Sequence, residues 1–372
     1  MRKLRILFIE PLMNGSHASV IRNYLLHTKH KIDLLSLDGE HWIKNLCTGA
    51  GRLSRHLNQK FPSPVHDIVV ATDLFQQGDF YTLQIKRFGN IPKIFLAHEH
   101  QFGVPKSGLR YDNDLNVRLS NVISTICADK CIFLSNSSMT QYTENLRTYL
   151  SENIAESIER KCKSINLGVD FKSFDKYPFV KNFDQAIILW NHRLEFDKNP
   201  EEFFRALNEL ATEGLDFKVI IASDTSDPNI SKEVKEGIGK LGDKIVHQGY
   251  VRNKKKLAQL YWKSNIVVST AEAEFFGLSV AEAIHCNCWP ILPKRLTFPQ
   301  FVPKRFHENH LYTNHKDFVA KLRWAIKNVP CLKNDALQQH VSKYSWDKIA
   351  PTWDEAIYRV YDEYRSKMSK NS

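Results

Sequence analysis

The chain of 372 residues is longer than the roughly 150 expected of one domain, so two domains are the default interpretation. Hydrophobic residues make up 42% and charged residues 25%, a balance that excludes an intrinsically disordered chain. No apolar run approaches the roughly 18 residues that span a bilayer, and the first apolar segment lacks a signal-cleavage pattern. We therefore expect a cytoplasmic protein whose contact with membranes, if any, is peripheral.

Charge and cysteine usage narrow the class further. Lysine and arginine number 52 against 41 aspartate and glutamate, an excess that favours a polyanionic partner. The excess is concentrated in residues 251–306, where a solvated lysine-rich face is the alternative interpretation. The seven cysteines have neither disulfide-framework nor paired zinc-ligand spacing, which favours reduced thiols.

Short apolar runs alternate with helical stretches along the chain, a pattern typical of parallel sheets covered by helices on both faces. In the first half we expect strands at 4–10, 31–37, 67–71, 93–98, 130–135 and 163–167, and helices at 120–128 and 137–150. In the second half we expect strands at 186–190, 217–223, 244–248, 265–270 and 289–292. The polar stretch 170–184 reads as a linker, and 346–368 as a packed terminal helix.

Two segments of the first half follow predicted strands. Asn14-Gly15-Ser16-His17 opens a helix, where glycine allows close approach of a ligand and free N–H groups attract phosphate or sugar oxygens. A plain turn is the alternative, because glycine commonly ends a strand. His98-Glu99-His100-Gln101 lies at a strand's carboxyl end, where open α/β sheets bind ligands. A third metal ligand is not apparent, so we favour hydrogen bonding to substrate, with a capped turn close behind.

In the second half, Arg193 and Lys198 share one strand-to-helix loop. A guanidinium and an ammonium five positions apart can clamp a diphosphate without magnesium. The less favoured alternative is a pair of surface salt bridges with Glu195 and Asp197.

The most specific pattern is Glu274 and Glu282 with seven residues between them, directly after a predicted strand. The backbone amides of Phe275, Phe276 and Gly277 are then expected at a helix N-terminus, suited to a phosphate and a sugar hydroxyl. In the alternative, Glu274 serves only as a helix cap.

This second-half pattern resembles the retaining glycosyltransferases of family 4. The resemblance implies an α/β, GT-B fold of two Rossmann-like domains facing across a cleft, with the C-terminal helix packing back on the N-terminal domain. It implies catalytic roles for His98, Arg193, Lys198 and Glu274. It also implies donor-binding roles for Gly15, Ser16, Tyr250, Val251, Phe275, Phe276, Gly277 and Glu282.

A closer resemblance is to the tRNA-queuosine mannosyltransferases, carried by the stretches 10–17, 98–101, 190–204 and 269–277. Asn191 and Asn287 depart from that family's pattern. The resemblance implies transfer of mannose from GDP-mannose, without metal or other cofactor, to the cyclopentenediol of queuosine at the wobble position of tRNA-Asp. Candidate contacts to the acceptor tRNA are His17, Glu99, His100, Gln101, Lys254, Lys255, Lys294 and Arg295.

The sequence predicts a division into domains and leaves alternative functions open. We expect an acceptor domain at 1–172, a linker at 173–184, a nucleotide-sugar domain at 185–345 and a crossover helix at 346–372. One alternative is a family 4 enzyme acting on a lipid-linked or polysaccharide acceptor at the membrane surface; another is a non-catalytic tRNA- or nucleotide-binding module. Asp112-Asn113-Asp114 could suggest a metal site, but helix N-capping explains it better.

Overall fold

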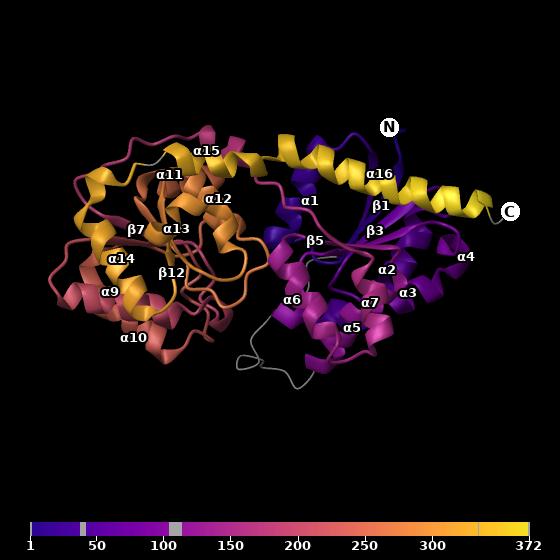
Figure 1. Ribbon diagram of the computed structural model, residues 1–372, viewed down its shortest axis with the longest axis horizontal. Coiled ribbons are helices and arrows are strands. Elements are labelled where there is room, and N and C mark those ends of the chain that lie inside the picture. Colours follow the sequence, from indigo (N-terminus) through magenta and orange to yellow (C-terminus); the bar gives the residue numbers. More distant parts are fainter. Residues whose placement is uncertain (1, 38–41, 104–113, 334, 371–372) are drawn as a thin grey trace. The chain divides into compact units, whose positions relative to one another are not determined.

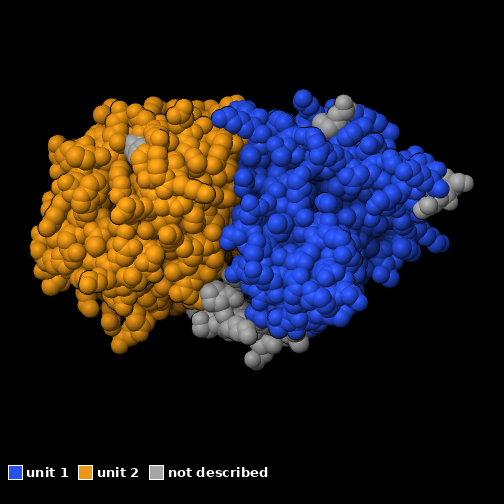
Figure 2. All heavy atoms as spheres, viewed as in Figure 1, with its two compact units in different colours: residues 1–104, 109–168, 346–372 blue, residues 105–108, 169–345 orange. Residues whose placement is uncertain are grey.

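The computed structural model describes residues 2–37, 42–103, 114–333 and 335–370, which divide into two compact units. The first unit is formed by the described residues of 2–103, 114–168 and 346–370, and the second by those of 169–345 (Figure 1 and Figure 2). The first unit therefore takes its last helix from the far end of the chain.

The first unit contains a six-stranded, all-parallel sheet. Its strands are β1 (Arg5–Glu10), β2 (Lys31–Ser36), β3 (Ile68–Thr72), β4 (Lys93–Ala97), β5 (Lys130–Phe133) and β6 (Cys162–Ser164). Their order in the sheet is β2-β1-β3-β4-β5-β6. The inner strands β1, β3, β4 and β5 are mostly apolar and buried because both faces of a parallel sheet are covered, whereas the edge strands β2 and β6 are more polar.

Helices cover both faces of this sheet. They are α1 (Gly15–His27), α2 (Trp42–Lys60), α3 (Gln77–Leu83), α4 (Ile85–Phe88), α5 (Asp114–Cys127), α6 (Asn136–Leu146), α7 (Glu152–Glu159) and α16 (Trp346–Lys370), with the 3-10 turn η1 (Gln101–Gly103). One core cluster packs around Phe75 and Phe80, and another around Phe133 and Tyr142.

The terminal helix α16, drawn in yellow in Figure 1, packs against α1. The buried carboxylate of Asp354 accepts hydrogen bonds from the Tyr24 hydroxyl at 2.7 Å, the Thr28 hydroxyl at 2.6 Å and the Lys29 N–H at 2.8 Å. Gly168 leaves room for the Trp346 ring, since an added Cβ would lie 2.1 Å from it. These contacts confirm the prediction that the C-terminal helix packs on the N-terminal domain.

The second unit repeats the architecture with its own six-stranded parallel sheet. Its strands are β7 (Ile187–Trp190), β8 (Lys218–Ile221), β9 (Ile245–Gln248), β10 (Ile266–Val268), β11 (Trp289–Pro293) and β12 (Leu311–Tyr312), in the order β12-β11-β10-β7-β8-β9. Its core surrounds Trp190, Phe203 and Phe204. The predicted α/β class is therefore confirmed.

Short helices and turns complete the second unit. They are α8 (Phe171–Asp175), η3 (Phe196–Lys198), α9 (Pro200–Thr212), α10 (Lys232–Leu241), η4 (Gly242–Lys244), α11 (Lys254–Lys263), α12 (Leu278–His285), η5 (Phe298–Phe301), η6 (Lys304–Phe306), α13 (His307–His310), α14 (His315–Lys327), η7 (Val329–Cys331), α15 (Asp335–Val341) and η8 (Ser342–Tyr344).

Two elements differ from the sequence reading. The expected linker 170–184 contains the helix α8, because Phe171 and Phe174 are buried and Asp170 accepts the N–H of Ser173 as a cap. The two-residue strand β12 was not expected, since so short a run has no period to detect. No helix among the described residues is long and apolar enough to cross a membrane.

Candidate active site

The loops that carry Gly15, Lys198 and Glu274 lie where the sheets reverse strand order, whereas His98 follows β4 and Tyr250 follows β9. In the first sheet β1 lies between β2 and β3, and in the second sheet β7 lies between β8 and β10. Open parallel sheets bind ligands beyond the carboxyl ends of the strands at such switch points. The loops that carry the predicted residues therefore meet at the expected edge within each unit.

In the second unit, Lys198 and Glu274 form a largely buried ion pair. Lys198 follows β7 and Glu274 follows β10, and the Nζ–Oε2 distance is 3.3 Å. The Lys198 ammonium also donates to the Ala273 carbonyl at 2.7 Å and lies 3.2 Å from the Asp197 carboxylate. Burial alone raises the pKa of Glu274, but the adjacent Lys198 charge outweighs it and holds that pKa below its usual value. Glu274 is therefore an ionised acceptor.

The β7–α9 loop that carries Lys198 is held by hydrogen bonds within the loop and to the loop after β10. Asn199 adopts a left-handed conformation (φ 49°) and caps α9 by accepting the Glu202 N–H. The Thr270 hydroxyl lies within hydrogen-bond distance of the Lys198 carbonyl at 2.9 Å and the Asn199 carbonyl at 2.8 Å, and the Asp197 carbonyl accepts the Ala273 N–H. The loops after β7 and β10 are thus tied together.

Arg193 occupies a different environment from Lys198. Its side chain is 60% exposed, against 11% for Lys198, and its guanidinium lies 3.2 Å from Glu195 and 3.7 Å from Asp197. The salt bridges that the sequence reading treated as the less favoured alternative are therefore present. They do not oppose a ligand role, since an exposed ion pair is worth little and its cation can exchange partners.

Glu274 also bonds to the backbone just before the next helix. Its Oε1 accepts the N–H of Gly277 at 3.0 Å, but Gly277 is the N-cap of α12 and that helix has no side-chain cap, so the ion pair with Lys198 is observed and the capping alternative is not. Gly277 has a φ of 93°, and a Cβ there would lie 2.7 Å from the Phe301 ring, so this position requires glycine. Helix α12 begins immediately afterwards and points its first N–H groups toward this loop.

The remaining candidate donor-binding residues lie on or near α12 and the loop after β9. Glu282 is buried on α12 with Lys254 at 3.6 Å, and burial raises its pKa despite that lysine. Lys254 also lies over the Phe174 ring at 4.4 Å. Tyr250 is 66% exposed, whereas Val251 is buried. Phe276 is buried against Phe301 and Tyr344, and Phe275 is partly exposed.

In the first unit, the loop after β1 holds a buried charge pair. Glu10 ends β1 and is fully buried, and its Oε2 lies 3.0 Å from Nδ1 of His17 on α1. Burial lowers the pKa of His17, but the Glu10 carboxylate outweighs it and raises that pKa to about 10. Gly15 begins α1 with a φ of 51°, and Ser16 beside it is exposed.

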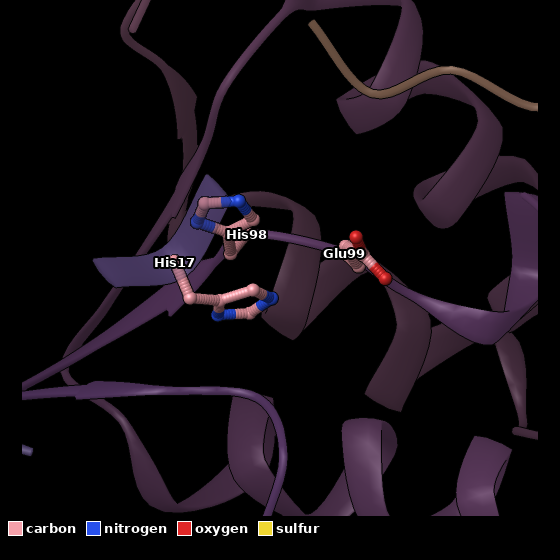
Figure 3. Close-up of side chains that lie close together, drawn as sticks. All are labelled: His17, His98 and Glu99. Carbon is pink, nitrogen blue, oxygen red and sulfur yellow. The ribbon is translucent and has the colours of Figure 1, made fainter. Parts of the chain in front are cut away.

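His98 lies directly against His17. The two imidazole rings stack with centroids 3.9 Å apart, and Glu99 points its carboxylate to the same place (Figure 3). Asp73, after β3, accepts the backbone N–H of His98 at 3.0 Å. Burial, reinforced by the His17 charge, holds the pKa of His98 well below its usual value, so this ring is neutral.

His17, His98 and Glu99 bring three potential metal ligands within 4.8 Å of one another. The ring planes are only 17° from parallel. A ring nitrogen directs its lone pair in the plane of the ring, so stacked rings cannot both point at one ion about 2.1 Å away. The observed arrangement suits hydrogen bonding better, and metal independence stays a prediction.

The structure places the other candidate acceptor residues unevenly. His100 is buried, hydrogen-bonds to Ser138 and packs on Tyr142, so it faces the core. The Gln101 N–H donates to Asn121. Lys255 lies 5.9 Å over the Tyr177 ring, and Lys294 is exposed. Arg295 donates to the Thr270 and Ala271 carbonyls, which braces the loop after β10.

Three residues of this site, Glu10, Asp73 and Asp197, were not singled out from the sequence, and Glu10 ends the predicted strand 4–10. Asp73 immediately follows β3, just as His98 immediately follows β4. The position directly after a predicted strand is the signal that selected His98, and it could have selected Asp73 as well. Asp197 was considered only as a surface salt-bridge partner for the pair Arg193 and Lys198, yet its side chain is buried beside Lys198. The Asp112-Asn113-Asp114 prediction lies outside the described residues, apart from the start of α5 at Asp114.

Solved structures share this fold across nearly the whole chain. Sucrose-phosphate synthase from Thermosynechococcus elongatus is 15% identical with a TM-score of 0.73, covering 97% of this chain and 100% of that one. The catalytic domain of starch synthase IV from Arabidopsis thaliana, bound to ADP and acarbose, is 13% identical with a TM-score of 0.70 and the same coverage. At these identities the likeness shows the fold alone, and the fold is GT-B.

Sequence comparison identifies the family. Residues 172–345 match the family described as glycosyl transferases group 1, and the chain is a glycosyltransferase. Residues 5–169 match the family described as tRNA-queuosine alpha-mannosyltransferase N-terminal. A Drosophila melanogaster protein named tRNA-queuosine alpha-mannosyltransferase is 27% identical over 365 residues, 94% of this chain and 93% of that protein. The chain belongs to the tRNA-queuosine alpha-mannosyltransferase family.

Proposed function

We propose that this glycosyltransferase acts on queuosine-containing tRNA, transferring mannose from GDP-mannose to a cyclopentenediol hydroxyl of queuosine at the wobble position of tRNA-Asp. The observation that carries the donor half is the Lys198–Glu274 pair at the β7–β10 switch point, beside the start of α12. The acceptor half is supported by the name of the family that residues 5–169 match and by the named relative.

In the proposed reaction, Lys198, Arg193 and the N-terminus of α12 bind the diphosphate and stabilise the charge that develops as it leaves. Ionised Glu274 accepts hydrogen bonds from hydroxyls of the donor sugar. The acceptor hydroxyl attacks the anomeric carbon from the face the diphosphate leaves, gives its proton to the departing phosphate, and configuration is retained. Two side-chain cations already offset the diphosphate charge, so this step uses no bridging metal.

The other donor and acceptor roles belong to the same proposal. Glu282 would accept from the nucleotide ribose, and the backbone at Tyr250 and Val251 would meet the base. Exposed lysines such as Lys294 would contact tRNA phosphates, so affinity for tRNA should fall steeply with salt. A tRNA acceptor also fits a cytoplasmic protein. Residues 1–172 are proposed to serve the acceptor and 185–345 the donor.

The proposal is tested by incubating the purified protein with queuosine-containing tRNA-Asp and, in separate reactions, GDP-mannose, GDP-glucose, UDP-glucose and UDP-galactose. The tRNA is then digested and its nucleosides are weighed. We expect queuosine to gain one hexose with GDP-mannose, and tRNA-Asp lacking queuosine to gain none. Hexose from a UDP-sugar alone would overturn the donor assignment.

The same assay separates the proposal from its alternatives. Adding EDTA should leave the rate unchanged, and loss of transfer would contradict a metal-independent departure of the diphosphate. Flotation with acidic liposomes should leave the protein unbound. Recovery with the liposomes, together with no transfer to tRNA, would favour an enzyme acting on a lipid-linked acceptor at the membrane surface.

Arg193→Ala should raise the Michaelis constant for GDP-mannose by roughly tenfold and lower turnover less, because one charge-assisted bond to the diphosphate is lost. Steady-state kinetics with varied GDP-mannose measure this. Arg205→Ala is the matched control, since that arginine is 61% exposed against 60% for Arg193 and pairs with Glu202 on α9. Equal kinetics for both variants would remove Arg193 from the diphosphate site.

A further inference from the structure

The carboxylate of Glu10 is held by two bonds at the end of β1. Its Oε1 accepts the N–H of Leu12 at 3.0 Å, and its Oε2 lies 3.0 Å from Nδ1 of His17. Glu10 has no exposed surface. An ionised carboxylate is kept in such a place only when a cation balances it, and His17 is the cation within reach.

The bond to Glu10 occupies only one nitrogen of His17. Within the described part of the chain, Nε2 of His17 has no hydrogen-bond partner, nor has either ring nitrogen of His98 or the carboxylate of Glu99. None of these atoms is among the described polar atoms that are sealed from solvent without a partner, so a ligand can reach them. They lie at the start of α1, beside Gly15.

The charged and titratable groups that face His17 come from three loops. Glu10 ends β1, Asp73 follows β3, and His98 and Glu99 follow β4. Burial, with smaller contributions from Glu99 and Glu10, raises the pKa of Asp73 to about 7, although the His17 charge lowers it. Of these groups, Glu10 alone bonds directly to the His17 ring.

We propose that Glu10 is a positioning residue for glycosyl transfer, whose buried carboxylate keeps His17 as an imidazolium stacked on the neutral ring of His98. The pair then presents one charged N–H donor and one uncharged imidazole to the ligand at the same time. Without Glu10, two stacked and buried imidazoles would both be neutral near pH 7, and the cation would be lost. This proposal depends on the proposed function in one respect, because glycosyl transfer is one of the two measurements that test it.

The test is Glu10→Gln, which keeps a hydrogen-bond acceptor for His17 and removes the charge. In the wild type, His17 should stay charged between pH 6 and 8.5, because its pKa is about 10. Titration of His17 should therefore cause no change in kcat/KM over this range. In Glu10→Gln, burial lowers that pKa, and above it the charged fraction falls about tenfold per pH unit. The variant should therefore regain activity as the pH is lowered.

A second readout needs no activity. NMR titration of the ring resonances, assigned to His17 by their loss in His17→Gln, should find this histidine charged at pH 8 in the wild type and neutral there in Glu10→Gln. Glu10→Asp keeps a carboxylate at this position, so it should restore the charged state of His17 in part. A wild-type His17 that is neutral at pH 7 would overturn the proposal, as would parallel pH profiles for wild type and Glu10→Gln.

The matched control is Asp33→Asn. Asp33 and His66 form another carboxylate–histidine pair of the same unit, 3.1 Å apart, near the amino-terminal ends of β2 and β3. This variant should lose stability and keep the wild-type pH profile, which separates general damage from a role of Glu10. If no nucleotide sugar supports transfer, the proposed function fails while the NMR titration still decides the state of His17.

Discussion

Glu274→Ala should leave a folded protein whose turnover with GDP-mannose is reduced by about 10²-fold or more. The substitution removes an ionised acceptor that is fixed by the Gly277 N–H on one oxygen and by Lys198 on the other. Lys198 keeps Asp197 at 3.2 Å as a partner, so no buried charge is left alone. Loss of the hydrogen bond to the Gly277 N–H should lower stability by only about 1 kcal/mol. Steady-state kinetics and thermal unfolding measure the two effects.

Glu272→Ala provides the control for this prediction. Glu272 lies two residues away on the same loop, is exposed, and accepts a hydrogen bond from Asn199 at 3.2 Å. Its replacement should leave turnover within about twofold of wild type, because surface substitutions of this kind have small effects. Near-normal turnover for Glu274→Ala would refute the placement of the donor sugar at this loop.

Lys198→Met should reduce transfer by about 10²-fold and also destabilise the second unit. The change removes a cation for the diphosphate and leaves Glu274 and Asp197 buried without it. Breaking such a pair costs about 3 kcal/mol. With Lys198 present, the pKa of Glu274 is lower in the folded protein than in the unfolded chain. Ionised Glu274 therefore stabilises the fold at pH values above the unfolded pKa, and this stabilisation is lost as the pH falls. Without Lys198, burial raises that pKa, so the destabilisation should be larger at pH 7 than at pH 4.

Urea unfolding at the two pH values measures this prediction, and kinetics measure the loss of transfer. Lys232→Met is the control, because Lys232 is 85% exposed on α10 and pairs with Glu236 in solvent. It should change neither stability nor turnover appreciably. Equal destabilisation of Lys198→Met at both pH values would show that the Glu274 charge does not depend on Lys198.

Much of the second unit's site could be predicted from sequence because its parts are close together in the chain. Gly277 with Phe275 and Phe276 before it predicted the start of α12, and the apolar run before it predicted β10. The alternation of strands and helices is a local signal, so it located eleven of the strands and the terminal helix. The twelfth, β12, has two residues and no period.

The sequence by itself determined the α/β class, the repeated parallel sheets and the loops that carry Arg193, Lys198 and Glu274, because these depend on periodicity and short spacings. Only the tertiary structure decided that Lys198 pairs with Glu274, that His100 faces the core, and that Glu10, Asp73 and His98 surround His17. The reason is physical: strand order places segments from distant parts of the chain at one edge of a sheet, and burial there sets their charges.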